Sequence, residues 1–181
     1  MRRDADTKHM RATLLTATAI VTMLSTTSCA PHAMTSGEAQ TEIQQAYAHQ
    51  DAGFAAKNLN DMFYHVQGTA KLTGTDGHTR SAGKAQSDMQ GIIVHGGSLT
   101  SQTRITKFSL DGKTATVMVA VHQTYTLVNT TSNTEQGITE PFDSTLTGQD
   151  TWTLTDDGWW QTAGKTLTDH ELRNGAPYDS N

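Results

Sequence analysis

The sequence contains a single cysteine, Cys29, so no disulfide can form within the chain. Basic residues are also few: after residue 29 the chain has nine lysines and arginines against sixteen acidic residues, a net charge of −7. No cluster of lysine and arginine stands out, which argues against nucleic-acid binding, because that needs a basic patch. The histidines show no spacing typical of metal ligands and have no cysteine partners, so we expect no metal site.

Motifs of several enzyme classes are absent as well. No G-x-S-x-G string occurs, so there is no sign of a serine hydrolase nucleophile. Gly96 and Gly97 lack the lysine and the strand context of a phosphate-binding loop, so no nucleotide cofactor is predicted.

The apolar stretch over residues 14–24 is too short for a permanent transmembrane helix.

Residues 1–29 have instead the pattern of a secretory signal peptide. Arg11 precedes the apolar stretch, and small residues follow it before Cys29. Met10 is an alternative start, because residues 1–9 form an unusual polar lead. An exported protein is therefore predicted, with a domain of about 145 residues that is long enough to bury a core without disulfides.

The end of this segment resembles the lipobox of bacterial lipoproteins, in which the cysteine after the cleavage point carries the lipid. Here Cys29 follows Ser28, although Thr26 stands where a leucine is usual. The resemblance implies a lipid anchor on Cys29, residues 30–37 as a tether, and a place in the bacterial cell envelope, on its periplasmic or surface side. Ordinary secretory cleavage beside a coincidental cysteine is the alternative.

The mature chain begins with helical patterns. In residues 38–57, the side chains of Ile43, Tyr47, Gln50 and Phe54 fall on one stripe at helical spacing. We expect Ile43, Tyr47 and Phe54 to be buried against the rest of the domain. Two further helices are predicted, a short one from about residue 60 and another over residues 83–94.

Later in the chain the pattern changes to the alternation of strands. A hairpin is predicted after residue 66, followed by strands over residues 98–110, 113–128, 145–155 and 159–168. Residues 129–144 read as an irregular loop and residues 171–181 as a flexible tail. Helices followed by consecutive antiparallel strands predict one α+β domain over residues 38–170, with the helices on one face of the sheet.

Some local strings resemble the nuclear transport factor 2-like superfamily, in its SnoaL-like and ketosteroid-isomerase-like bacterial branch. They are AKNLNDMFY at residues 56–64, GKA at residues 83–85, and DTW at residues 150–152. The resemblance implies a cystatin-like curved antiparallel sheet that forms a cone around the long N-terminal helix. It also implies no single reaction, because the superfamily holds isomerases, dehydratases, cyclases and non-catalytic binding modules.

Two departures lower the expectation of catalysis. Related sequences often have a histidine where this chain has Lys165, and an acid where it has Gln67. The remaining acid–base candidate is Asp150, whose pKa would rise if the carboxyl group were buried in the cone, with Tyr125 or His65 assisting. The alternatives are that Asp150 is a solvated edge residue and that Tyr125 is a core aromatic.

A ligand pocket is predicted where the helical stripe faces the strands, because polar and aromatic side chains would meet there. Its expected lining is Tyr47, Gln50, Tyr125, Asp150 and Trp152.

The sequence thus predicts an envelope-anchored module that binds a small apolar ligand or a partner and has no clear catalytic residues. The alternative is a cofactor-free isomerase, dehydratase or cyclase that uses Asp150 as its base. A weak homodimer is also predicted through the opposite face of the strand at residues 113–128, which carries Met118, Ala120, His122 and Thr124.

Overall fold

The computed structural model describes residues 34–129 and 138–178, so the predicted signal peptide, Cys29 and the first half of the tether lie outside the described residues. The long helix α1 (Ser36–Ala56) begins at a capping box, in which Thr35 accepts a hydrogen bond from the Glu38 backbone and Glu38 accepts one from Thr35 at 2.8 Å. The helix ends at Lys57, whose left-handed φ of 55° stops it. Because Thr35 is the cap, residues 36 and 37 belong to the helix and the predicted tether was too long.

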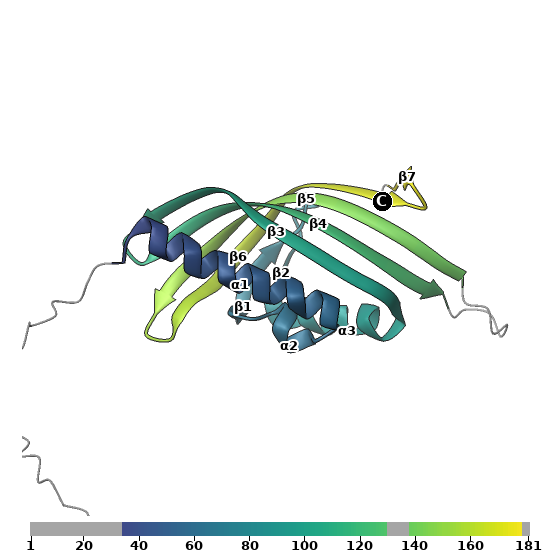
Figure 1. Cartoon of the computed structure of the whole chain (residues 1–181), viewed down its shortest axis with the longest axis horizontal. Coiled ribbons are helices and arrows are strands. Elements are labelled where there is room, and N and C mark those ends of the chain that lie inside the picture. The colour runs from purple at the N-terminus through teal and green to yellow at the C-terminus, as the bar shows by residue number, and fades with distance from the viewer. Residues whose placement is uncertain (1–33, 130–137, 179–181) are drawn as a thin grey trace, which may run out of the picture. The chain divides into compact units, whose positions relative to one another are not determined.

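The other elements follow in the predicted order of helices and strands. They are α2 (Leu59–Met62), β1 (Val66–Thr73), β2 (Thr79–Ser81), α3 (Ala82–His95), β3 (Gly96–Asp111), β4 (Thr114–Asn129), β5 (Ile138–Thr155), β6 (Gly158–Arg173) and β7 (Ala176–Pro177). The strands form one curved sheet in the order β2-β1-β6-β5-β4-β3, and β7 pairs with β6. The long strands arch over α1, as Figure 1 shows. The predicted α+β class is confirmed.

One strand pair departs from the predicted antiparallel sheet. β1 runs parallel to β6, with Leu72 opposite Gly164, while the other strand pairs of the described residues are antiparallel. The sequence indicated a hairpin partner for one side of β1 only. The other side pairs with the last long strand, and alternation along a strand carries no information about the direction of its partner.

The predicted loop and tail were both placed wrongly, for one shared reason. Residues 138–144 belong to β5, and they pair with the end of β6 from Phe142 opposite Arg173 onward. Each of these extensions supplies the hydrogen-bonding partner of the other, so neither is evident from its own sequence. The folded region therefore continues past residue 170, because β7 also pairs with Leu172 and Arg173.

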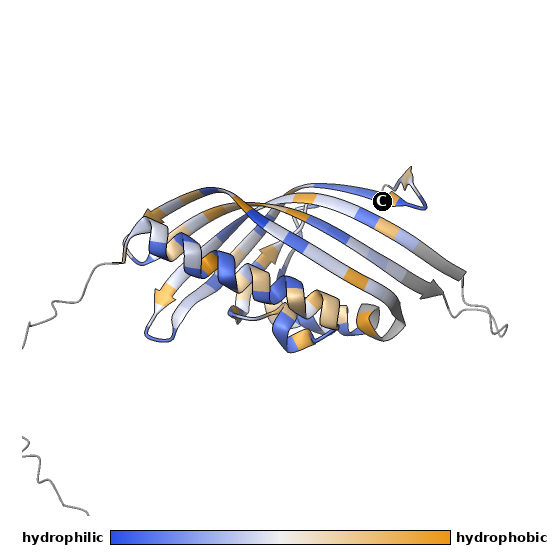
Figure 2. Ribbon diagram, viewed as in Figure 1, coloured by the Kyte–Doolittle hydropathy of each residue, from blue (hydrophilic) through white to orange (hydrophobic). Residues whose placement is uncertain are grey.

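The core lies between α1 and the sheet. Ile43 and Tyr47 are buried as predicted, whereas Phe54 is only partly buried and lies outside the core cluster, so its predicted burial was wrong. Strongly hydrophobic residues alternate with pale or hydrophilic ones along the long strands (Figure 2), so each strand gives the core only one face. The strand residues that pack with α1 in this cluster are Ala115, Val117, Val119, Trp152 and Trp159.

Polar side chains of α1 also hold the edge strand β3. Gln44 donates to the carbonyl oxygen of Thr103 at 3.1 Å and accepts from the backbone of Ile105 at 3.3 Å. Asp51 accepts from the backbone N–H and the hydroxyl of Thr103 at 2.7 and 2.9 Å. These bonds fix the position of the helix along the strand.

None of the helices in the described ranges is long and apolar enough to cross a membrane.

Candidate functional site

A cavity of about 280 Å³ lies between α1, α2 and the concave face of the sheet, and we call it the cone cavity. Most of its wall is apolar, and the aliphatic part comes from β1, β4 and β5 as well as from α2. A polar group of three residues, Tyr47, Asp150 and Gln161, lines the end next to the hydrophobic core. The other polar residues of the lining are Gln50, Asp51, Ser101, Thr103 and Gln123. The apolar lining includes Met62, Leu72, Val119, Val121 and Leu146.

Asp150 is at the centre of the polar group. It stands on β5 with Val117 of β4 on one side and Gly164 of β6 on the other, and only 8% of its surface is exposed. The Tyr47 hydroxyl donates a hydrogen bond of 2.5 Å to Oδ2 of Asp150, and Gln161 donates to the same carboxylate. These two donors orient the carboxylate at the cavity wall.

A second layer supports Tyr47. The indole Nε1 of Trp152 donates to the Tyr47 hydroxyl oxygen at 2.9 Å, and the two rings meet edge to face with centroids 5.2 Å apart. Trp152 is fully buried beneath Tyr47 and does not line the cone cavity, contrary to the prediction. The reason is its place on β5, one step closer to the core than Asp150 on the same face.

Burial determines the electrostatics of this group. Loss of hydration disfavours the charged carboxylate and raises the pKa of Asp150 from 3.8 to about 6, although the hydrogen bonds from Tyr47 and Gln161 oppose the rise. Burial and the neighbouring Asp150 also raise the pKa of Tyr47, so its hydroxyl stays protonated as a donor. At neutral pH, the cone cavity therefore holds a mostly ionised carboxylate that can accept a hydrogen bond or a proton.

A glycine makes room for this carboxylate. A Cβ atom at Gly164 would lie 2.8 Å from Oδ1 of Asp150, 3.0 Å from Nε2 of Gln161 and 3.1 Å from Cδ2 of Leu72. The absence of a side chain at Gly164 thus permits the contact between Asp150 and Gln161. We did not predict Gln161 or Gly164 as site residues. The available signal was that Gln161 lies two residues after Trp159, on the buried face of β6.

The structure separates Tyr125 from Asp150. Tyr47, Gln50 and Asp150 line the cone cavity together, but Tyr125 lies eight residues along β4 from Val117, the partner of Asp150. At the rise of a strand this is roughly 25 Å. The Tyr125 hydroxyl instead donates to Glu171 at 3.0 Å, and its ring stacks on Phe142 with centroids 4.7 Å apart.

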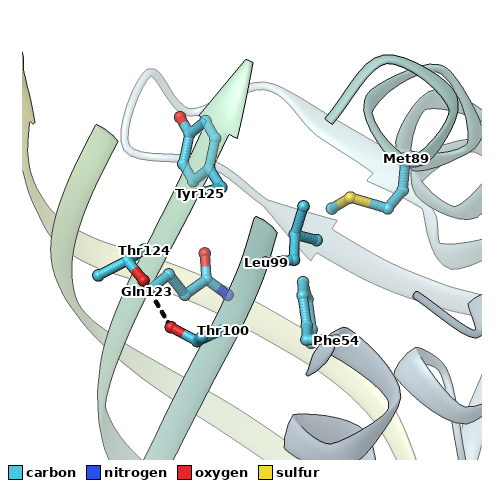
Figure 3. A pocket seen from close by; sticks show the side chains of 7 residues that line it. All are labelled: Phe54, Met89, Leu99, Thr100, Gln123, Thr124 and Tyr125. Carbon is cyan, nitrogen blue, oxygen red and sulfur yellow. Dashed lines mark hydrogen bonds between the residues drawn. The ribbon is translucent and has the colours of Figure 1, made fainter. Parts of the chain in front are cut away.

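Tyr125 lines a second cavity of about 150 Å³, which we call the outer cavity. It lies between the end of α1, the middle of α3 and the strands β3 and β4. In Figure 3, the side chain of Met89 on α3 points toward Leu99. Phe54 lies beside Leu99, and Tyr125 lies farther along β4. Phe54 and Gln123 line both cavities, so the two spaces adjoin.

His65 lies elsewhere, so the three predicted catalytic candidates do not converge. Its ring is stacked between Tyr64 and Trp160, with centroid distances of 4.2 and 4.8 Å. It lines a separate depression with His49 and Tyr64, not the cone cavity. The backbone of His65 is left-handed (φ 56°) at the start of β1, a turn that the sequence did not reveal. In the described part of the chain, no group of three or more His, Cys, Asp or Glu residues could hold a metal ion.

Comparison of the sequence with protein-family models and with curated proteins gives no match. Solved structures are nevertheless similar. A protein from Kribbella flavida (Kfla4162) aligns with a TM-score of 0.62 at 12% identity, over 76% of this chain and 95% of its own. A putative scytalone dehydratase from Novosphingobium aromaticivorans has a TM-score of 0.58 at 12% identity, over 78% and 89% of the two chains.

A putative dehydratase of the nuclear transport factor 2-like family, from Streptomyces avermitilis, has a TM-score of 0.54 at 12% identity. The alignment covers 73% of this chain and 97% of that one. Structural similarity at such low sequence identity establishes the fold but not an activity. The chain therefore has the nuclear transport factor 2-like fold that its local strings resemble.

Proposed function

We propose that the protein binds a small, largely apolar molecule in the cone cavity and orients it by one hydrogen bond to Asp150. The observation that carries this proposal is the buried carboxylate of Asp150 at one end of a cavity with mostly apolar walls; the other carboxylate in the lining, Asp51, is bonded to Thr103. Apolar walls with a few placed polar groups are the usual composition of a ligand site. The volume of about 280 Å³ fits a small molecule.

The polar end indicates the chemistry of the ligand. Both donors that reach Asp150 come from the protein, and its carboxylate remains able to accept another hydrogen bond. An ionised carboxylate repels anionic ligands in a poorly hydrated space. Because the walls are also mostly apolar, the preferred ligand is uncharged and carries a donor, such as a hydroxyl, phenol or arylamine N–H.

The fluorescence of N-phenyl-1-naphthylamine tests this proposal, because the probe is uncharged, carries one N–H donor and brightens in apolar surroundings. We expect saturable binding to the wild-type protein and loss of binding in Val121→Trp, which fills the cone cavity. The matched control is His122→Trp, which adds the same side chain on the opposite face of β4. Binding that is absent, or equal in the two variants, would refute the proposal.

A second candidate function is acid–base catalysis without a cofactor, of the isomerase, dehydratase or cyclase type. It is favoured by the buried Asp150, because a carboxylate with a pKa of about 6 is a stronger base than an ordinary aspartate. Tyr47 is the only hydroxyl that reaches Asp150 through a hydrogen bond among the described residues, so it replaces Tyr125 and His65 as the assisting group. The names of two similar structures, both putative dehydratases, support testing this chemistry.

Exchange of the α-protons of cyclohexanone in D2O, followed by NMR, provides a test of this second function. If Asp150 is a base, the wild-type protein should speed the exchange, with a rate that rises through pH 6. Asp150→Asn should remove the effect while keeping the shape of the side chain. Equal rates for the two proteins would leave the binding function alone.

We further propose that the domain is anchored in the bacterial cell envelope through a lipid on Cys29. The support is the signal-peptide pattern and the single cysteine at its end. Mass spectrometry of the membrane fraction should find a lipid-modified Cys29 as the first residue, and Cys29→Ser should release the protein. An unmodified mature terminus at another residue would refute the anchor.

A further inference from the structure

The cone cavity and the outer cavity meet at two side chains, Phe54 and Gln123. We propose that they accept one elongated amphiphilic ligand, with its polar group at Asp150 and its hydrocarbon chain passing Phe54 into the outer cavity. This proposal rests on the proposed binding function and adds the class of ligand.

The inward face of β4 gives the ligand a continuous track. Val119 and Val121 line the cone cavity, Gln123 lines both cavities, and Tyr125 lines the outer one. These are every second residue of one strand, so they lie on the same face and are spaced about 7 Å apart. A straight chain along this face would therefore leave Asp150, pass Gln123 and end beside Tyr125.

The outer cavity suits a hydrocarbon rather than a second polar group. Its side-chain walls come mainly from Phe54, Met89, Leu99 and Tyr125, and none of the described residues that line it is charged. The Tyr125 hydroxyl is already bonded to Glu171. Met89 has an unbranched, flexible side chain, which adapts readily to a hydrocarbon partner (Figure 3).

Phe54 occupies the boundary between the two spaces. It follows Ile43 and Tyr47 on the same stripe of α1, yet it is only partly buried and does not belong to the core cluster. Its ring is therefore held less tightly than a core ring and can yield to a chain that passes it.

The test is a series of 1-alkanols, from 1-butanol to 1-hexadecanol, whose binding is measured by displacement of N-phenyl-1-naphthylamine, because a long chain is needed to reach the outer cavity from Asp150, three strand steps of about 7 Å away at Gln123. Each CH2 group that enters an apolar space should tighten binding about fourfold. We expect this gain to continue through the long members in the wild-type protein. In Met89→Trp, which fills only the outer cavity, short alkanols should bind as before, and the gain should stop at a shorter chain.

A measurement on the wild-type protein guards against misfolding of the variant. With 1-hexadecanol bound, NMR should show a nuclear Overhauser effect between the terminal methyl group of the ligand and the Met89 methyl group. With 1-butanol this contact should be absent. The two results together locate the end of the chain.

The outcomes separate the two proposals. If the gain stops at the same chain length in the wild type and in Met89→Trp, or if the end of 1-hexadecanol does not contact Met89, the elongated ligand is refuted while the binding function stands. If no alkanol binds, or if Val121→Trp binds the short alkanols as well as the wild type, the binding function itself is refuted.

Discussion

The hydroxyl group of Tyr47 and the carboxylate of Asp150, 103 residues apart in sequence, meet in a buried hydrogen bond of 2.5 Å. Tyr47 is on the helix and Asp150 on a central strand, so this bond joins the two layers of the fold at the wall of the cone cavity. Trp152 donates to the same hydroxyl, which gives the pair a fixed geometry. The bond therefore links the stability of the domain to the chemistry of its site.

Removal of the hydroxyl in Tyr47→Phe should destabilise the protein. The buried N–H of Trp152 loses its acceptor and Asp150 loses a donor, and each unsatisfied group costs about 1–3 kcal/mol. The pKa of Asp150 should also rise further, because this hydrogen bond lowers it. Urea denaturation and NMR titration measure the two effects. In the control Tyr125→Phe, the titration of Asp150 should not change, and a shift there would contradict this assignment.

The free energy of unfolding should depend on pH through Asp150. Its pKa is about 6 in the folded protein and 3.8 in the absence of the fold, so ionisation disfavours the folded state. The stability that comes from the neutral form is complete below pH 3.8 and is lost as the pH rises through about 6, a change on the order of 3 kcal/mol. Asp150→Asn should lack this loss, and parallel curves for the two proteins would argue against a buried Asp150.

A methyl group at Gly164 should disturb the site directly. In Gly164→Ala the new Cβ would lie 2.8 Å from Asp150, so the carboxylate must move away from Gln161 or the strands must shift. We expect a loss of about 1–3 kcal/mol of stability and weaker binding of N-phenyl-1-naphthylamine. Gly68→Ala is the matched control, because a Cβ there meets nothing within 4 Å. Equal free energies of unfolding for Gly164→Ala and Gly68→Ala would contradict this prediction.

The outer face of the sheet should support a weak homodimer. Ala120 and His122 of β4 lie beside Gln102 and Arg104 of β3 in a shallow depression on that face. We expect the sedimentation coefficient to rise with protein concentration and to become constant in Ala120→Arg, which places a charge in the contact. A monomer at all concentrations would contradict the prediction.

Residue spacing was enough to predict much of the fold. The helical stripe placed Ile43 and Tyr47 in the core, and strand alternation placed Asp150 on an inward face. The spacing of residues within one element did not predict the features that depend on a neighbouring element. β1 takes β6 as a parallel partner, and β5 and β6 extend each other, which neither sequence shows alone.

The candidate site was predictable only in part, for a related reason. Alternation gives the face of a strand but not the position along it, so Tyr125 and Asp150 were grouped although the register places them far apart. Gln161 and Gly164 matter because β6 lies beside β5, a pairing that their own sequence does not encode. Asp51 and Gln44 looked like ordinary polar residues of a helix until the position of β3 was known.

The bonds from Gln44 and Asp51 to β3 have a consequence for how molecules of this protein behave together. β3 is sixteen residues long and stands at the edge of the sheet, where open backbone groups invite a strand from another molecule and lead to aggregates. At Thr103 and Ile105 those groups are already taken by the helix. The middle of this edge strand therefore cannot pair with a strand of another molecule. The protein is thereby protected from forming fibrous aggregates at high concentration.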